Sequence, residues 1–63
     1  MKDITHKKGL IRVEKKEFQG HEFIDVRRYY KTDDGEWRPT PKGVTLPLDK
    51  AEEIAEAIKK ELQ

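Results

Sequence analysis

The segment FIDVRRYYKTDDGEWRPTPKG, residues 23–43, decides the fold and the function expected for this chain of 63 residues. It contains four of the five aromatic residues of the chain. Aromatic rings offer flat faces on which bases stack, and cations between them offer partners for phosphates. The segment is therefore typical of a protein that binds single-stranded nucleic acid. The cations interleaved with its aromatics are Arg27, Arg28, Arg38 and Lys42.

The clearest strand pattern covers residues 21–31, which are rich in Phe, Ile, Val and Tyr. Alternation places Ile24 and Val26 toward a core. The pattern loosens after Val26, so either the strand leaves the core there or a bulge changes the alternation. With a bulge, Tyr30 would share a surface with Arg27.

A strand is also expected before this segment, over residues 9–18, where Ile11 and Val13 alternate with charged residues. Gly20 follows in a tight turn that favours positive φ. Phe18 ends the strand. Its position alone favours a side chain packed at the edge of the core over an exposed stacking face.

Two shorter strands are expected later in the chain. Asp-Asp-Gly at residues 33–35 predicts a hairpin turn into a return strand over residues 36–38. That strand should end there, because the next prolines cannot donate ladder hydrogen bonds. Residues 38–43 then form a stiff extended loop, which either recognises a ligand or only connects strands. A fourth strand begins at Val44 and ends at Pro47.

An amphipathic helix is expected after the fourth strand. Asp49 is its expected N-cap, with a glutamate three residues later. Apolar residues at helical spacing form one stripe that should pack on the sheet, and any apolar excess is available to a partner helix. The stripe comprises Ala51, Ile54, Ala55, Ile58 and Leu62.

Length and composition predict an oligomer. A chain this short buries only about 60% of its unfolded surface, and with no cysteine it has no disulfide to add stability. With 33% hydrophobic and 43% charged residues its core must be small, so association is the expected source of the missing stability. Residues 1–8 show no periodicity and are expected to be a flexible N-terminal segment before a domain over residues 9–63.

The charge distribution predicts two unlike surfaces. Residues 1–43 carry 11 Lys or Arg against 8 Asp or Glu, whereas residues 44–63 carry 3 against 5. The strands thus hold the cations that could face phosphates. No run is apolar enough for a membrane span or a secretory signal. The expected location is the cytoplasm, with the nucleoid, in a prokaryote and the nucleus in a eukaryote.

From Phe18 to Ile58 the chain resembles the C-terminal core of the transcriptional coactivator positive cofactor 4 (p15) family. The most specific part is IDVRRYYKTDDGEWRPTPKGVTL, residues 24–46. The resemblance implies an α+β fold, a curved four-stranded antiparallel sheet followed by one C-terminal helix (β-β-β-β-α), in a homodimer. It further implies largely sequence-independent binding of single-stranded DNA in transcription regulation or in replication and repair, without enzymatic activity, cofactor or metal.

The resemblance also implies the binding residues. The family's aromatic at the first turn corresponds to Phe18, its central arginine to Arg27 and its second stacking aromatic to Tyr30. The family's turn F-K-G-K is F-Q-G-H here, its loop P-G-R-K-G is P-T-P-K-G, and its stacking Trp is a Tyr. Each lost cation should weaken binding and flatten its salt dependence. The implied set is Phe18, Gln19, His21, Arg27, Tyr30, Arg38, Pro39, Thr40, Pro41, Lys42 and Gly43.

Two other functions fit the same residues. The lost cations favour a protein-interaction module that docks on the transcription machinery, and RNA is an alternative ligand. A metal-dependent nuclease would use the carboxylates of the hairpin, but turn roles explain Asp33 and Asp34 better, and neither histidine has a catalytic partner at a recognisable spacing. The carboxylates concerned are Asp25, Asp33, Asp34 and Glu36.

Overall fold

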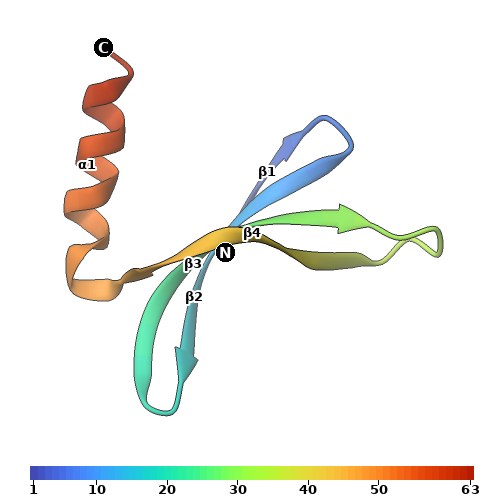
Figure 1. The fold of residues 1–63 in the computed structure, drawn as a ribbon, viewed down its shortest axis with the longest axis horizontal. Helices are drawn as coiled ribbons and strands as arrows, with labels where there is room; N and C mark the ends of the chain where they lie inside the picture. The colour runs from blue at the N-terminus through green and yellow to red at the C-terminus, as the bar shows by residue number, and fades with distance from the viewer.

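The computed structural model describes all 63 residues, as one antiparallel sheet followed by a helix (Figure 1). The four strands pair in sequence order, which confirms the predicted fold class. The sheet is strongly twisted, so its three hairpin turns point in different directions (Figure 1). The elements are β1 (Lys2–His6), β2 (Gly9–Phe18), β3 (His21–Lys31), β4 (Trp37–Pro47), the short 3-10 helix η1 (Leu48–Lys50) and α1 (Ala51–Glu61).

Strand β1 occupies a segment for which the sequence predicted no regular element, and that prediction is wrong. Its residues are all exposed, so they show no apolar pattern. The strand is held by its ladder with β2 and by Asp3, which accepts hydrogen bonds from Arg12 Nε at 2.8 Å and Nη2 at 3.1 Å. A strand of this kind is specified by its partner and not by its own periodicity.

The two short strands expected after the hairpin are in fact the single strand β4, which runs through Pro39 and Pro41. Proline is tolerated there because β4 is at the edge of the sheet, with only β3 beside it. The pairing shifts between Arg27, opposite Gly43, and Tyr29, opposite Pro39. Residues 40–42 therefore bulge opposite a single residue of β3, and the expected stiff loop is an irregular part of an edge strand.

Both predicted hairpin turns are present. Gln19 and Gly20 join β2 to β3 with φ values of 51° and 80°, the two positive angles of a two-residue hairpin turn. In the turn from β3 to β4, Gly35 has a φ of 87°. Thr32 closes this turn, because its N–H donates to the Glu36 carbonyl at 2.7 Å and its hydroxyl bonds to Asp34.

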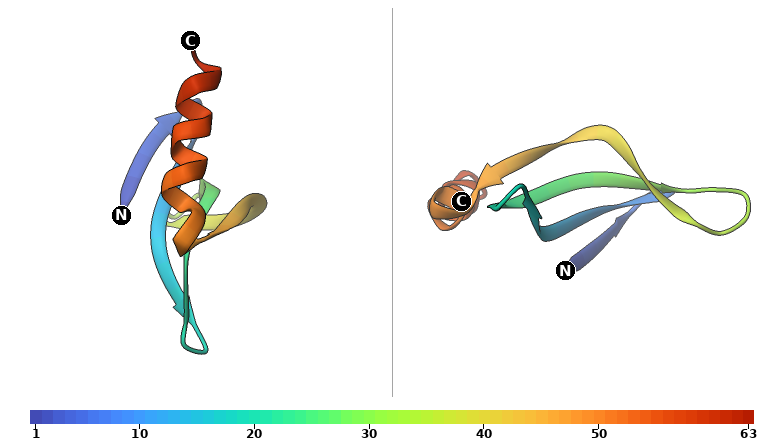
Figure 2. Two further views of the ribbon diagram at one scale, coloured as in Figure 1. Left: turned by 90° about the vertical axis from the view of Figure 1, so that its left-hand side faces the viewer. Right: turned by 90° about the horizontal axis from the view of Figure 1, so that it is seen from below.

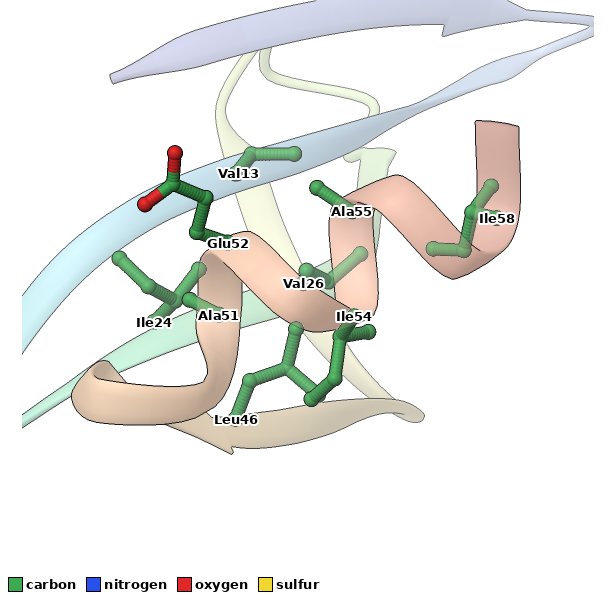
Figure 3. Close-up of a pocket in the computed structure, with 9 residues that line it drawn as sticks. All are labelled: Val13, Ile24, Val26, Leu46, Ala51, Glu52, Ile54, Ala55 and Ile58. Carbon is green, nitrogen blue, oxygen red and sulfur yellow. The ribbon is translucent and has the colours of Figure 1, made fainter. Parts of the chain in front are cut away.

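Helix α1 leaves the end of β4 and stands away from the sheet (Figure 2). Its N-cap is Lys50, without a side-chain cap, so the prediction of Asp49 as N-cap is wrong, because Asp49 lies inside the preceding 3-10 turn. The apolar stripe does not close onto the sheet: no residue of α1 is buried. A groove of about 470 Å³ separates them (Figure 3). It is lined by Val13, Ile24, Val26 and Leu46 of the sheet and by Ala51, Glu52, Ile54, Ala55 and Ile58 of α1.

Candidate nucleic-acid interface

The register of the sheet separates two faces with different chemistry. Even-numbered residues of β2 pair with odd-numbered residues of β3, and paired side chains in an antiparallel ladder point to the same side. We call this side the Arg27 face, and the side that lines the groove the helix face. The Arg27 face comprises Leu10, Arg12, Glu14, Lys16 and Phe18 of β2, His21, Phe23, Asp25, Arg27, Tyr29 and Lys31 of β3, and Trp37, Pro39, Gly43, Thr45 and Pro47 of β4.

Arg27 is fixed in the middle of this face. Its Nε and Nη2 donate to the Asp25 carboxylate at 3.4 and 3.2 Å, and its Nη1 donates to the Thr40 carbonyl at 2.9 Å. About a quarter of the side chain stays exposed, at 23%. A guanidinium has five N–H donors, so two remain for a ligand. Arg27 is thus held in one orientation with two N–H groups free for a ligand.

Gly43 makes this position of Arg27 possible. It lies directly opposite Arg27 in the ladder. A Cβ at Gly43 would lie 2.9 Å from the Arg27 Cβ and 2.8 Å from the Val26 carbonyl oxygen, closer than real contacts allow. Of the implied binding residues, Gly43 therefore acts by leaving room for the arginine.

Asp25 forms an ion pair with a second cation, Lys16, beside Arg27. The Lys16 ammonium lies 3.3 Å from Asp25 Oδ2 and 3.9 Å from Glu14 Oε1. Two cations thus share the Asp25 carboxylate, and Glu14 balances the charge of the cluster. Burial alone would raise the pKa of Asp25, but the hydrogen bonds and charges of Arg27 and Lys16 outweigh it, and the pKa of the carboxyl is lowered. Only 3% of Asp25 is exposed, which makes it the buried anchor of both cations.

Acid is expected to weaken the fold through Asp25. A carboxyl whose pKa in the folded chain lies below its ordinary value stabilises the fold at higher pH, and this contribution disappears as the pH falls through the folded pKa. The difference in unfolding free energy between wild type and Asp25→Asn should be constant above about pH 5 and should shrink below about pH 4. Urea titrations at several pH values measure it. A difference that grows on acidification would contradict the lowered pKa.

Phe18 lies at one end of the Arg27 face and is 66% exposed. The interpretation of Phe18 as a packed residue is therefore wrong, because residues 17–22 at this end of the hairpin are all exposed and nothing covers the ring. His21 is its ladder partner on the same face, and Gln19 lies in the turn between them. The structure thus brings an open aromatic ring onto the face that carries Lys16 and Arg27.

Tyr30 and Arg38 do not share this face. The pairing of β2 with β3 continues unbroken to Tyr30, so the bulge lies in β4 and leaves the alternation of β3 unchanged. Tyr30 is 47% exposed and opposes Arg38, whose Nη2 bonds to Glu36 at 3.0 Å. These two residues are ladder partners at the far end of the other face. The hypothesis that a bulge brings Tyr30 beside Arg27 is wrong.

The bulge of β4 occupies the edge between the two faces. The Thr40 hydroxyl donates to the Arg28 carbonyl at 2.8 Å and accepts from the Lys42 N–H at 3.1 Å. With its carbonyl bonded to Arg27, Thr40 holds the bulge to β3. Lys42 and Pro41 are exposed there, so the bulge presents a cation at the rim of the Arg27 face.

Sequence reasoning missed Lys16, because it stands in the run Lys15–Lys16–Glu17. A signal was available: Lys16 is two residues before Phe18, so in a strand the two share a face. Arg12 lies on that face too, with its Cζ 4.4 Å from the centroid of the buried Tyr29 ring. Arg12 is paired with Asp3, whereas Lys16 shares the Asp25 carboxylate with Arg27. Lys16 is therefore the residue to add to the cluster around Arg27.

Three of the four carboxylates considered for a nuclease have other partners. Asp25 binds Lys16 and Arg27, Asp34 binds the Thr32 hydroxyl, and Glu36 binds Arg38. No group of three or more His, Asp or Glu side chains is placed to hold a metal ion. These contacts give Asp25, Asp34 and Glu36 structural roles in β3 and the turn that follows it.

Comparison with known families supplies one match. The family model described as Transcriptional Coactivator p15 (PC4) matches residues 5–57 of the chain. Comparisons with curated proteins and with solved structures gave no match. The matched range covers the end of β1, all of β2, β3 and β4, and most of α1. No helix in the structure is long and apolar enough to cross a membrane.

Proposed function

The chain belongs to the transcriptional coactivator p15 (PC4) family, and we propose that it binds single-stranded DNA as a homodimer, with little sequence preference, in transcription regulation or in replication and repair. The family is one of non-enzymatic, DNA-associated coactivators. The observation that carries the proposal is the joint placement of Phe18, Lys16 and Arg27 on one face. An open ring beside oriented cations fits a base and its phosphates.

The contacts on each protomer divide into phosphate partners and stacking rings. Arg27 and Lys16 would hold phosphates along the middle of the Arg27 face, and Phe18 would stack a base at its end. Lys42 would extend the positive charge over the β4 edge. Beyond that edge, Tyr30 and Arg38 offer a second stacking ring and cation. Because these groups contact bases only through ring faces, they impose little sequence preference.

The isolated protomer is too open for a stable small domain, which supports the homodimer. A compact protein of 7.5 kDa should expose about 4,200 Å², whereas this chain exposes 5479 Å². Its radius of gyration of 13.2 Å also exceeds the roughly 11 Å of a compact chain of this length. The excess of about 1,200 Å² is comparable with the ~800 Å² that each partner buries in a stable complex.

The groove between α1 and the sheet is where the second copy would bind. Eight of its nine lining residues are hydrophobic, and only four residues of the whole chain are buried. The apolar stripe of α1 would fill this space against its symmetry mate, since a twofold interface pairs the same patch on both protomers. The Arg27 face lies on the other side of the sheet and would remain open in such a dimer.

Fluorescence anisotropy with labelled oligo(dT) tests the function directly. We expect binding at low salt, with an affinity that falls steeply as salt is added, because each phosphate contact releases counterions. Failure of the folded protein to bind at low salt would overturn the proposal. A parallel titration with oligo(U) decides the nucleic acid: preference for RNA would replace DNA as the ligand.

Phe18→Ala is expected to weaken oligo(dT) binding without unfolding the chain. Loss of one stacked base costs ~1–3 kcal/mol, or about 5- to 150-fold in Kd, and an exposed ring contributes little to the core. Anisotropy gives the affinity and circular dichroism the fold. Phe18→Leu is the matched control: it keeps apolar bulk but lacks a stacking face, so it should bind as weakly as the alanine variant. Wild-type affinity in both variants would remove Phe18 from the site.

A second candidate function is a module that binds the transcription machinery. Gln19 and His21 favour this module. They stand beside Phe18 where the family turn F-K-G-K has two lysines, so this chain lacks two cations there. A pull-down from nuclease-treated extract separates the two. Capture of polymerase or a regulator that survives nuclease, with no oligonucleotide binding, would favour the module.

A further inference from the structure

Trp37 is exposed on the Arg27 face, and the binding contacts proposed above do not use it. It opens β4 opposite Lys31, the last residue of β3. Since Arg27, Tyr29 and Lys31 follow one another at spacing two, Trp37 lies on the same side as Arg27. It is the only tryptophan of the chain, and 38% of it is exposed. The largest aromatic side chain thus stands open at the end opposite Phe18.

Lys31 gives Trp37 a cation but does not cover it. The Lys31 ammonium lies 6.0 Å from the centroid of the indole, at the outer limit of a cation–π contact. Lys31 forms no ion pair, and the carboxylates of Asp34 and Glu36 in the following turn bind Thr32 and Arg38. A flat ring and an unpaired ammonium therefore stand side by side.

We propose that Trp37 and Lys31 form an additional nucleotide subsite, in which the indole stacks on a base and the ammonium binds the adjacent phosphate. This rests on the proposed single-stranded DNA binding and extends the site along the whole of β3. From His21, beside Phe18, to Lys31 the strand spans about 33 Å. That length matches about ten nucleotides at the ~3.4 Å per nucleotide of a stacked strand. The Lys16 and Arg27 cluster then lies between two stacking rings.

The tryptophan itself reports on the subsite in the unmodified protein. We expect oligo(dT) to quench Trp37 fluorescence along the same isotherm that anisotropy records, and an oligomer much shorter than ten nucleotides to bind more weakly. Trp37→Leu should raise Kd about 5- to 150-fold, whereas Trp37→Phe, which keeps a ring, should stay closer to wild type. Lys31→Ala should reduce the slope of log K against log salt by about 0.7.

The outcomes distinguish failure of the Trp37–Lys31 subsite from failure of the proposed single-stranded DNA binding. If oligo(dT) binds with no quenching and Trp37→Leu keeps wild-type affinity, the subsite is overturned while the proposed function stands. If the folded wild type binds no oligo(dT) at low salt, both fail. Quenching that saturates with binding, together with the loss in Trp37→Leu and its rescue in Trp37→Phe, supports the subsite.

Discussion

Arg27→Ala is expected to weaken oligo(dT) binding by about 10- to 150-fold, since a hydrogen bond to a charged group contributes ~1.5–3 kcal/mol. It should also reduce the slope of log K against log salt by about 0.7, the loss of one phosphate contact to a single strand. Because Asp25 is buried and would keep only Lys16, we expect the unfolding free energy to fall by about 1–3 kcal/mol as well.

A double variant separates the expected loss of affinity for oligo(dT) from the expected loss of stability. Asp25→Asn removes the buried charge that Arg27→Ala leaves with one partner, so the double variant should regain most of the lost stability. It should not regain affinity, because the cation that contacts phosphate is still missing. Urea unfolding and anisotropy on the four proteins complete the cycle. If Asp25→Asn restores oligonucleotide binding to Arg27→Ala, the arginine acts only by holding the fold.

Ile54→Asp is expected to dissociate the proposed dimer and to unfold much of the chain. Ile54 points from α1 into the groove (Figure 3), where the partner's apolar stripe would surround it. Removing the side chain and adding an unpaired carboxylate should cost at least about 3 kcal/mol per chain. Because both chains of a symmetric dimer carry the change, the dissociation constant should rise by roughly 10⁴-fold. Sedimentation over a range of concentrations measures the mass, and circular dichroism the fold.

Ala57→Asp is the matched control for this substitution. It introduces the same charge into the same helix, at an exposed residue that does not line the groove. If the wild type forms the proposed dimer, Ala57→Asp should have the same mass and bind oligo(dT) with the same affinity. A stable, folded monomer of wild type, or dissociation of both variants to the same extent, would contradict a dimer formed through the groove.

The sequence predicts the centre of the fold well. The alternation of residues 21–31 and the two turns with positive φ are local features, so the pattern identifies β3, both hairpins and the helix. It does not identify β1, whose side chains are exposed on both sides and whose ladder depends on β2. It also ends β4 too early, because the tolerance of Pro39 and Pro41 depends on their edge position, which only the assembled sheet defines.

The sequence names candidate site residues, but it does not predict how they are arranged. Phe18 and Arg27 do share a face, as the spacing within each strand and the register across the hairpin require. Tyr30 does not join them, because the bulge lies in β4, and a bulge has no sequence signal that names its strand. Lys16 stands in a run of charged residues, so the sequence does not single it out. Its contact with Arg27 is made through Asp25, and the burial of Asp25 depends on tertiary contacts.

Photocrosslinking tests the central claim, that the Arg27 face binds single-stranded DNA, most directly. An oligo(dT) carrying 5-iodouracil crosslinks to aromatic side chains that stack on it, and mass spectrometry of the peptides locates them. We predict crosslinks at Phe18, lost when salt releases the strand, and none on α1. Crosslinks confined to α1 or the groove, or none from a complex that anisotropy shows to be formed, would contradict the account.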